Sequence, residues 1–311
     1  MDVGTIYRSR APVRISFAGG GTDVSPYLEE HGGFVVSTTI TSYAWSSVEF
    51  SLEAGHVLGD TYNRVREYAL DEKLVYDGKL DVLKAVLNHF KPDLGVRMYM
   101  RNDVPHRSGL GSSAAAFVSL IGLFNKVDFR PQLTEYEVAE LAFRLERDEL
   151  RNLGGRQDQY ASVFGGLNYI EFKPTGQVIV NPIKMLRATE LEFEKHLILA
   201  YIMDREVSGD IIGDQTQNYE KGNKKTRTGL DETKQIAQQM NQALRCGDLT
   251  RFGELLHQSW EAKKKFSKMI TNKKIDSIYE KARKAGALGG KISGAGGGGH
   301  MVFFCDSGCE E

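Results

Sequence analysis

The stretch SGLGSSAAAF at residues 108–117 places glycines and serines directly before an apolar run that is typical of a helix. Gly109 and Gly111 let the backbone approach a ligand closely, and a helix start offers unpaired N–H groups at the positive end of its dipole. This combination predicts an anion site, most often one for phosphate. Ser112 and Ser113 fit either an N-cap or hydroxyls near a phosphate-bound Mg²⁺, and capping is the commoner role for serines at a helix start.

The composition is that of an ordinary globular chain. Its 311 residues, 41% hydrophobic and 26% charged, are enough for two domains. The 40 basic and 41 acidic side chains nearly cancel, which gives no electrostatic signature of nucleic-acid or membrane binding. No apolar stretch approaches the roughly 18 residues of a membrane helix, the start MDVGTIYRSR lacks a signal-peptide core, and three cysteines are few for a disulfide framework. We therefore expect a cytoplasmic protein that binds neither nucleic acid nor membrane, and we leave its oligomeric state open.

The pattern of apolar residues predicts a mixture of strands and helices. Strands are expected over 33–40, 44–52, 96–104, 165–172, 196–202 and 300–305. Helices are expected over 80–90, from Ser113 onward, over 134–150 after a capping box of Thr134 and Glu137, and as three amphipathic helices over roughly 229–285. Because strands and helices do not alternate regularly, an α+β fold is favoured over a doubly wound sheet. The loop KPTGQ at 173–177 divides the chain into predicted domains 1–175 and 176–311.

Two familiar phosphate-binding motifs fit the glycine-rich stretches only in part. AGALGGKI at 285–292 lacks the first glycine of a Walker A loop and the hydroxyl residue after its lysine. GAGGGG at 294–299 has the glycine spacing of a dinucleotide fingerprint but precedes an expected strand instead of a helix. Gly109–Ala114 fits G-x-G-x-x-A, with Asp128 about twenty residues further on. An NAD-binding oxidoreductase is therefore an alternative.

Three glycine-containing stretches follow one another along the chain: RISFAGGGTD at 14–23, PHRSGLGSSAAAF at 105–117 and GGKISGAGGGGHMVFF at 289–304. Together they resemble the signature motifs of the galactokinase, homoserine kinase, mevalonate kinase and phosphomevalonate kinase (GHMP) superfamily. The resemblance spans nearly the whole chain. It implies an α+β fold with an N-terminal domain like that of ribosomal protein S5, a ferredoxin-like C-terminal domain, and ATP bound between them. The loop around the triphosphate would consist of Ser108, Gly109, Leu110, Gly111, Ser112 and Ser113.

Within this family, RAPVRISFAGGGTD and GGRQDQYASVFGG are most similar to the sugar 1-kinase branch that includes heptose 7-phosphate kinases. The resemblance implies transfer of the ATP γ-phosphoryl group to the anomeric hydroxyl of a sugar phosphate, a heptose 7-phosphate, for nucleotide-activated heptose synthesis. Relatives tend to carry a TG…R pattern after the strand at 196–202, where this chain reads MDREVSGD. A free sugar phosphorylated at C1, as by a fucokinase or galactokinase, is therefore kept as an alternative acceptor.

Phosphoryl transfer needs charge neutralisation, a metal across the phosphates, and a group that orients or deprotonates the acceptor hydroxyl. Asp158, in GGRQDQY, is our candidate base and matches the family's catalytic aspartate; by itself it fits a helix N-terminus equally well. Arg14 matches the family's active-site arginine, although a lone arginine more often forms a surface salt bridge. Beside Asp158 it would keep the carboxylate ionised and meet the charge on the γ-phosphoryl group.

Glu146 borders the buried face of the helix expected over 134–150, where a carboxylate requires a partner. The resemblance implies that this glutamate and Ser113 hold Mg²⁺, an ion that prefers oxygen ligands and retains several waters. An ion pair with Arg147 or Arg151 is the simpler alternative.

Contacts with the acceptor are expected from glycine-rich segments and from local basic side chains. Thr22 and Asp23 follow three glycines, so they can reach a ligand past bare backbone. A phosphorylated acceptor needs a second anion site, for which Arg205, the run 224–227 in a loop expected to be mobile, and 263–265 are candidates. The predicted substrate-binding set is Gly20, Gly21, Thr22, Asp23, Arg205, Lys291, Gly294, Ala295, Gly296 and Gly297. An inactive sugar-binding member of the family is a further alternative, since fold does not guarantee activity.

Overall fold

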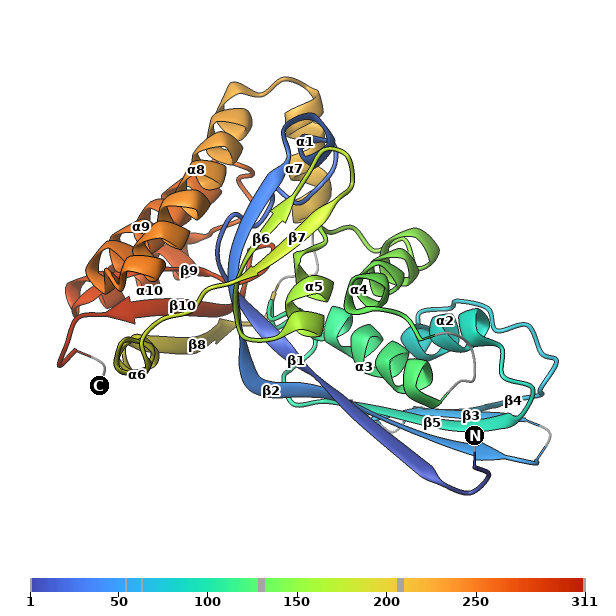
Figure 1. The fold of residues 1–311 in the computed structure, drawn as a ribbon. Helices are drawn as coiled ribbons and strands as arrows, with labels where there is room; N and C mark the ends of the chain where they lie inside the picture. The colour runs from blue at the N-terminus through green and yellow to red at the C-terminus, as the bar shows by residue number, and fades with distance from the viewer. Residues whose placement is uncertain (1, 54, 63, 128–131, 206–209, 310–311) are drawn as a thin grey trace.

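The computed structural model describes residues 2–53, 55–62, 64–127, 132–205 and 210–309. These residues form two lobes that lie side by side, each built on its own sheet and its own helices (Figure 1). The predicted α+β class is confirmed. Among the described residues, no helix is both long enough and apolar enough to cross a bilayer.

The first lobe is built on a mainly antiparallel sheet, whose described strands number seven in the order β4-β3-β5-β2-β6-β7, with β1 paired to β2. The strands are β1 (Ile6–Ala18), β2 (Gly33–Ser51), β3 (His56–Asp60), β4 (Val65–Tyr68), β5 (Gly95–Asn102), β6 (Leu167–Phe172) and β7 (Val178–Pro182). The two strands expected over 33–40 and 44–52 are one continuous strand, β2. It stays unbroken because β1 pairs along most of its length, while β6 and β5 pair with its first and last parts.

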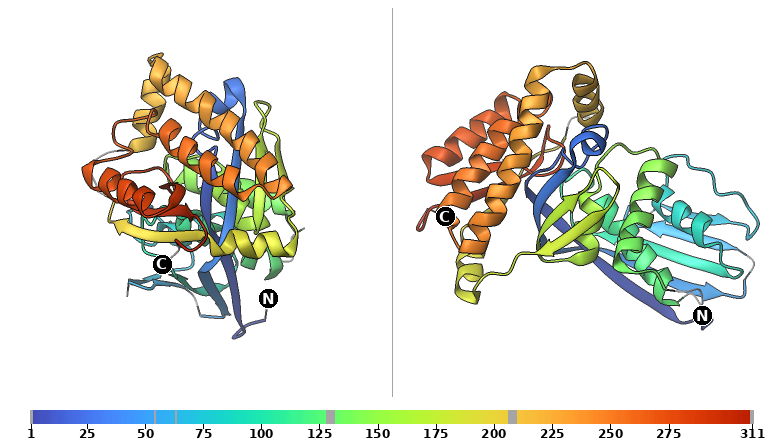
Figure 2. Two further views of the ribbon diagram at one scale, coloured as in Figure 1. Left: turned by 90° about the vertical axis from the view of Figure 1, so that its left-hand side faces the viewer. Right: turned by 45° about the horizontal axis from the view of Figure 1, so that its top comes forward.

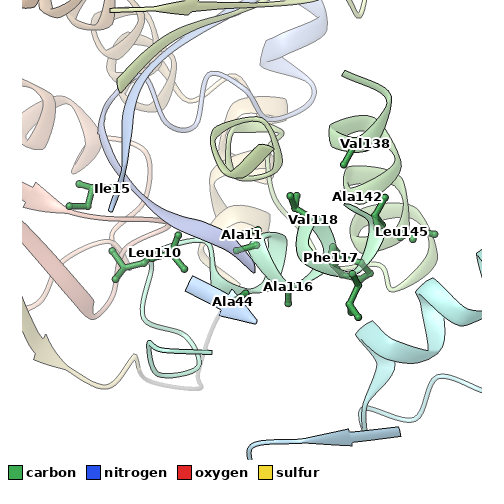
Figure 3. Close-up of a cluster of buried hydrophobic side chains, with 14 of the residues drawn as sticks. Ala11, Ile15, Ala44, Leu110, Ala116, Phe117, Val118, Val138, Ala142 and Leu145 are labelled. Atoms are coloured by element: carbon green, nitrogen blue, oxygen red, sulfur yellow. The ribbon is translucent and has the colours of Figure 1, made fainter. Parts of the chain in front are cut away.

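Helices cover one face of this sheet (Figure 1). They are α2 (Asp81–Phe90), α3 (Ser112–Val127), α4 (Glu135–Arg144), a π-helical turn (Leu145–Glu149) and α5 (Gln157–Phe164), and a short α1 (Tyr27–His31) follows β1. The predicted capping box is present at the start of α4, where Thr134 and Glu137 bond each other's backbone N–H groups. Helix α3 packs between the sheet and α4 through side chains such as Ala116, Phe117 and Val118 (Figure 3).

The second lobe has an antiparallel sheet of three described strands, in the order β8-β10-β9. Its elements are α6 (Arg187–Lys195), β8 (Leu197–Met203), α7 (Ile211–Glu220), α8 (Lys224–Cys246), α9 (Leu249–Lys263), α10 (Lys273–Lys284), β9 (Ala287–Ile292) and β10 (Gly299–Cys305). The three amphipathic helices are present as α8, α9 and α10, and α8 lies along α9 (Figure 2). The run 224–227 is not a loop but the first turn of α8, capped by the Asn223 side chain.

The predicted domain boundary falls inside the first sheet. The loop at 173–177 is the turn of the β6–β7 hairpin, closed by the Lys173 N–H bonded to the Gln177 carbonyl at 2.8 Å. Glycine and proline mark tight turns as readily as linkers, so the composition alone could not separate the two. The chain passes to the second lobe only after Pro182, where β7 ends.

The two lobes share an aromatic cluster. Phe17, near the end of β1, meets Phe193 of α6 and Phe252 of α9 with ring centroids 5.8 and 5.2 Å apart. Phe304 of β10 packs against the same group, with its ring 5.1 Å from that of Phe252 in an edge-to-face arrangement. All four side chains are at most 5% exposed, so the apolar core runs without interruption from one lobe to the other.

Candidate active site

A cavity of about 380 Å³ lies between the two lobes. The first lobe supplies Arg14, Ser16, Gly20, Gly21, Val24, His106–Gly109, Gly111–Ala114, Glu146, Arg147, Asn152–Gly155, Gln157 and Asp158. The second lobe supplies Arg205, Ile212, Gln215, Lys263, Gly294 and Ala295. A larger cavity of about 860 Å³, beside His56 and the segment 70–76, contains none of the residues predicted from the sequence.

The loop before α3 owes its shape to two glycines and one leucine. Gly109 and Gly111 have φ values of +79° and +73°, a region that side chains with a Cβ rarely adopt. Between them Leu110 is fully buried and lies in the core with Ala11, Ala44 and other apolar side chains (Figure 3). The buried leucine anchors the loop while the glycines turn its backbone toward the cavity.

The second glycine-rich loop packs backbone to backbone on the first. A Cβ on Gly109 would lie 2.4 Å from the carbonyl oxygen of Ser293, and a Cβ on Gly299 would lie 2.5 Å from that of Ser108. The Ser108 carbonyl accepts the backbone N–H of His300 at 3.0 Å and lies 2.9 Å from the Nδ1 of the same histidine. Glycines at both positions therefore permit a contact through which the second lobe supports the phosphate loop.

Asp158 and Arg14 form an ion pair at the centre of the cavity. Asp158 lies in the first turn of α5, and its Oδ1 accepts from Arg14 Nε at 2.8 Å and lies 2.5 Å from Arg14 Nη2. The remaining nitrogen, Arg14 Nη1, donates to the carbonyl of Gly109 at 2.7 Å. Asp158 Oδ2 faces Gly111 and has no hydrogen-bond partner within the described part of the chain, so it is free to meet an acceptor hydroxyl.

Glu146 and Ser113 meet on the other side of the phosphate loop. The π-helical turn turns Glu146 fully inward, leaving it 3% exposed, where Gln159 Nε2 donates to its Oε2 at 2.7 Å. Burial raises the pKa of Glu146, while nearby Arg147 and a hydrogen bond with the Ser113 hydroxyl lower it. The alternative partner Arg147 also forms an ion pair with Glu146, with its Nη2 3.7 Å from Oε2.

This pair of oxygens fits Mg²⁺ as an incomplete ligand set. No group of three or more His, Cys, Asp or Glu side chains among the described residues could hold a metal without help. An ion here would have to draw its other ligands from water and phosphate oxygens, the arrangement that Mg²⁺ adopts in phosphoryl-transfer sites. Residues Ser113 and Glu146 both line the cavity, next to the phosphate loop.

The predicted acceptor contacts divide into two groups. The cavity is lined by Gly20, Gly21, Arg205, Gly294 and Ala295, but not by Thr22, Asp23, Lys291, Gly296 or Gly297. Thr22 Oγ1 donates to the carbonyl of Gly19 at 2.8 Å, and Asp23 accepts the backbone N–H groups of Gly21 and Gln157 at 2.9 and 3.0 Å. These two side chains hold the shape of their own loop.

Lys291 is 2% exposed in β9 and donates through Nζ to the carbonyl of Ser16 at 2.6 Å. It therefore links the sheet of the second lobe to β1 and lies behind the cavity wall. This contact joins residues 275 positions apart in the chain, which no local pattern could indicate.

Most of the basic candidates for a second anion site lie elsewhere. Lys224 and Lys225 are exposed at the start of α8, outside the cavity. Lys264 pairs with Glu261 at 2.7 Å, and Lys265 pairs with Glu232. Of the basic residues singled out in the second lobe, only Arg205 and Lys263 line the cavity.

Several cavity residues escaped the sequence-based prediction. The segment 152–155 and helix α7, through Ile212 and Gln215, also line the cavity. Gln215 Nε2 donates to the carbonyl of Gly21 at 3.2 Å, which ties α7 to the first lobe. The two adjacent glycines before Asp158 could have indicated that the segment 152–155 lines a site. No sequence feature of α7 indicated the same for that helix.

Comparisons with known proteins identify the family. Residues 74–166 match the GHMP kinases N terminal domain, and residues 240–308 match the GHMP kinases C terminal domain. The chain is 36% identical over 306 residues to D-glycero-alpha-D-manno-heptose 7-phosphate kinase of Campylobacter jejuni, covering 96% of this chain and 89% of the relative. It is 28% identical to galactokinase of Lactococcus lactis, covering 94% of this chain and 81% of the relative.

Solved structures agree with these relatives. The crystal structure of a D-glycero-D-manno-heptose 1-phosphate kinase from Bacteroides thetaiotaomicron superposes with a TM-score of 0.77 at 30% identity, covering 97% of this chain and 88% of the other. The chain belongs to the GHMP kinases. The family inferred from the three motifs is thereby confirmed.

The dinucleotide alternative finds no support in the fold. A Rossmann unit needs neighbouring parallel strands joined through a helix. Here β5, which precedes the glycine loop, and β6, the next described strand after α3, are separated by β2, which is antiparallel to both. Asp128, the acidic residue of that alternative, lies outside the described residues.

Proposed function

We propose that the protein is an ATP-dependent sugar kinase that phosphorylates the anomeric C1 hydroxyl of D-glycero-D-manno-heptose 7-phosphate. The product would be the 1,7-bisphosphate, a precursor of nucleotide-activated heptose. The observation that carries the proposal is the convergence of the phosphate loop, the Asp158–Arg14 pair and the Ser113–Glu146 pair on one cavity. An inactive sugar-binding role would leave this combination without a purpose. The choice of sugar rests on the relative with 36% identity.

The geometry gives each group a role in the reaction. The loop 108–113 would hold the triphosphate of ATP through backbone N–H groups at the start of α3. Asp158 Oδ2 would take the proton of the acceptor hydroxyl, since Oδ1 is held by Arg14. The ion pair fixes the orientation of the carboxylate. Glycines Gly20 and Gly21, with the segment 152–155, would line the acceptor.

Ser113 and Glu146 would hold the Mg²⁺ ion that accompanies ATP. When bound, this ion would supply positive charge that offsets the charge of the triphosphate. Gln159 keeps Glu146 in place by its hydrogen bond, and the serine hydroxyl approaches from the first turn of α3. The cytoplasmic location expected from the sequence stays a prediction.

The test of the function is turnover of a panel of acceptors. Heptose 7-phosphate is expected to exceed free heptose, fucose and galactose in kcat/KM by orders of magnitude, because a phosphate gains charge-assisted hydrogen bonds of roughly 1.5 to 3 kcal/mol each. ADP release, followed by a coupled assay, measures each rate, and ³¹P NMR locates the new phosphate. Equal turnover of free and phosphorylated heptose would reduce the assignment to a simple sugar 1-kinase. Preference for fucose or galactose would favour the alternative acceptors.

A second prediction concerns the metal. Ser113→Ala and Glu146→Gln are each expected to raise the Mg²⁺ concentration needed for half-maximal activity and to lower kcat. The double variant should be little worse than the poorer single variant, because both changes remove ligands from one ion. Titration of activity and of nucleotide affinity with Mg²⁺ measures the effect. If the two losses of activity were additive, Ser113 and Glu146 would not ligate the same ion.

A further inference from the structure

The guanidinium of Arg205 has two buried nitrogens that bond no described group. The residue follows β8 and lines the cavity, and its Nε and Nη2 are both buried with no hydrogen bond to any described group. A donor buried in this way costs free energy unless a ligand completes it, so an orphaned arginine facing a cavity points to an anion. Burial and the neighbouring cations Arg14 and Arg107 lower the pKa of Arg205, against the opposing effect of Asp158.

Arg14 cannot easily take the role that the sequence suggested for it. Its three nitrogens are occupied, two by Asp158 and one by the carbonyl of Gly109. To clamp a phosphoryl group, it would have to release the candidate base or the phosphate loop. Arg14 therefore orients Asp158, whereas Arg205 has nitrogens available for the transferred group.

Lys263 lies beside Arg205. It is 6% exposed at the end of α9, lines the cavity, and donates through Nζ to the carbonyl of Gly294 at 2.7 Å. Burial, Arg14 and Arg205 lower the pKa of Lys263 to about 8, while Asp23 and Asp158 act in the opposite direction. An ammonium group with three donors and one carbonyl partner has donors left for a ligand.

The position of Arg205 fixes which anion it meets. Its Nη2 is 3.6 Å from the point where a Cβ on Gly109 would lie, and its own Cα lies against Gly298. The residue thus starts against the second glycine-rich loop and extends its guanidinium to the phosphate loop. Gly109 also accepts from Arg14, which pairs with Asp158, so Arg205 lies close to the candidate base. This part of the cavity adjoins both the phosphate loop and the candidate base, where a γ-phosphoryl group in transfer would lie.

We infer that Arg205 and Lys263 bind the transferred phosphoryl group itself during the reaction, and not a remote phosphate of the acceptor. The inference rests on the proposed kinase function and deepens it. In the step, the bond from the γ-phosphorus to the β–γ bridging oxygen breaks and a bond to the acceptor oxygen forms. The hydroxyl proton passes to Asp158 and ADP leaves. Arg205 and Lys263 donate hydrogen bonds to the γ-phosphoryl oxygens throughout, and they form no covalent bond.

The experiment separates the two roles by kinetics and by a binding measurement that needs no acceptor. Arg205→Met and Lys263→Met are expected to lower kcat by about 10²- to 10³-fold, the loss seen when one preorganised donor is removed. The ratio of kcat/KM for heptose 7-phosphate to that for free heptose should stay unchanged. By calorimetry, ADP with Mg²⁺ should bind as in the wild type, whereas the tighter binding of ADP with Mg²⁺ and aluminium fluoride, a mimic of the transferred group, should be lost.

Matched variants complete the design. Lys264→Met, which removes an ion pair with Glu261 outside the cavity, should leave every measurement unchanged. Arg205→Lys should restore part of kcat, and the thermal midpoint of each variant shows that it folds. If the variants lost the preference for heptose 7-phosphate over free heptose but kept kcat on free heptose, the two cations would bind a remote phosphate of the acceptor. If kcat did not change, neither cation would take part in the reaction. If the wild type phosphorylated no heptose, the aluminium fluoride measurement would still decide the inference.

Discussion

Asp158→Asn is expected to lower kcat by about 10²- to 10⁴-fold, the range that general-base assistance contributes. The asparagine keeps the size of the side chain but offers no basic oxygen to the acceptor hydroxyl. It also weakens the contact with Arg14, whose Nε and Nη2 both meet Oδ1 in the native protein. Steady-state kinetics on heptose 7-phosphate measure the loss, and equilibrium binding of ATP should stay within a few-fold of the wild type.

The matched control is Gln157→Asn, one residue away in the same helical turn and also at the cavity wall. It should alter KM for the acceptor more than kcat, because the side chain bonds Asp23 and bears no basic oxygen. If Asp158→Asn kept more than about a tenth of the wild-type kcat while binding ATP normally, proximity and the metal would carry the reaction without a base.

Gly299→Ala is expected to weaken ATP binding by at least about tenfold, which corresponds to about 1.4 kcal/mol. The φ of Gly299 is +85°, and an added Cβ would lie 2.5 Å from the carbonyl oxygen of Ser108. The methyl group must push that carbonyl away from the two nitrogens of His300 that it meets. Because Gly299 does not line the cavity, the loss would come from displacement of the phosphate loop and not from a lost contact with ligand.

Gly122→Ala is the control for the effect of a glycine-to-alanine change. Gly122 lies within α3, the helix that follows the phosphate loop, and an added Cβ would meet nothing within 4 Å. Alanine there should raise stability by about 0.5–1 kcal/mol through helix propensity and leave ATP affinity unaltered. Calorimetric affinity and thermal midpoints distinguish the two variants. Normal ATP affinity in Gly299→Ala would show that the second loop does not shape the first.

Local chemistry made part of this molecule predictable. The phosphate loop follows from glycines at φ-positive positions directly before a helix start, and the beginning of α4 follows from the Thr134–Glu137 capping box. Both depend on residues within a few positions of one another. The roles of Asp158, Arg14 and Glu146 could be proposed because three motifs resembled one family, since each residue alone fits a structural role as well.

Contacts between distant residues were beyond the reach of sequence patterns. Arg14 and Asp158 are separated by 144 positions, so their pairing depends on how α5 packs against β1. The sequence suggested that Asp23 contacts a ligand. In the structure its carboxylate instead accepts backbone N–H groups of its own loop and of α5. The orphaned nitrogens of Arg205 could not be foreseen either, because a missing partner is a property of the folded surroundings.

The aromatic cluster that joins the lobes combines residues from early and late parts of the chain, so a growing chain cannot complete it until the late residues are made. Phe17 is made well before Phe252, which it meets, and before Phe304, which packs on Phe252. The phosphate loop also depends on a late residue, because the His300 that contacts Ser108 belongs to β10, the last described strand. A nascent chain that stops before β10 therefore leaves an apolar face uncovered and a nucleotide loop unsupported at the same time. The apolar core and the nucleotide loop therefore both depend on β10.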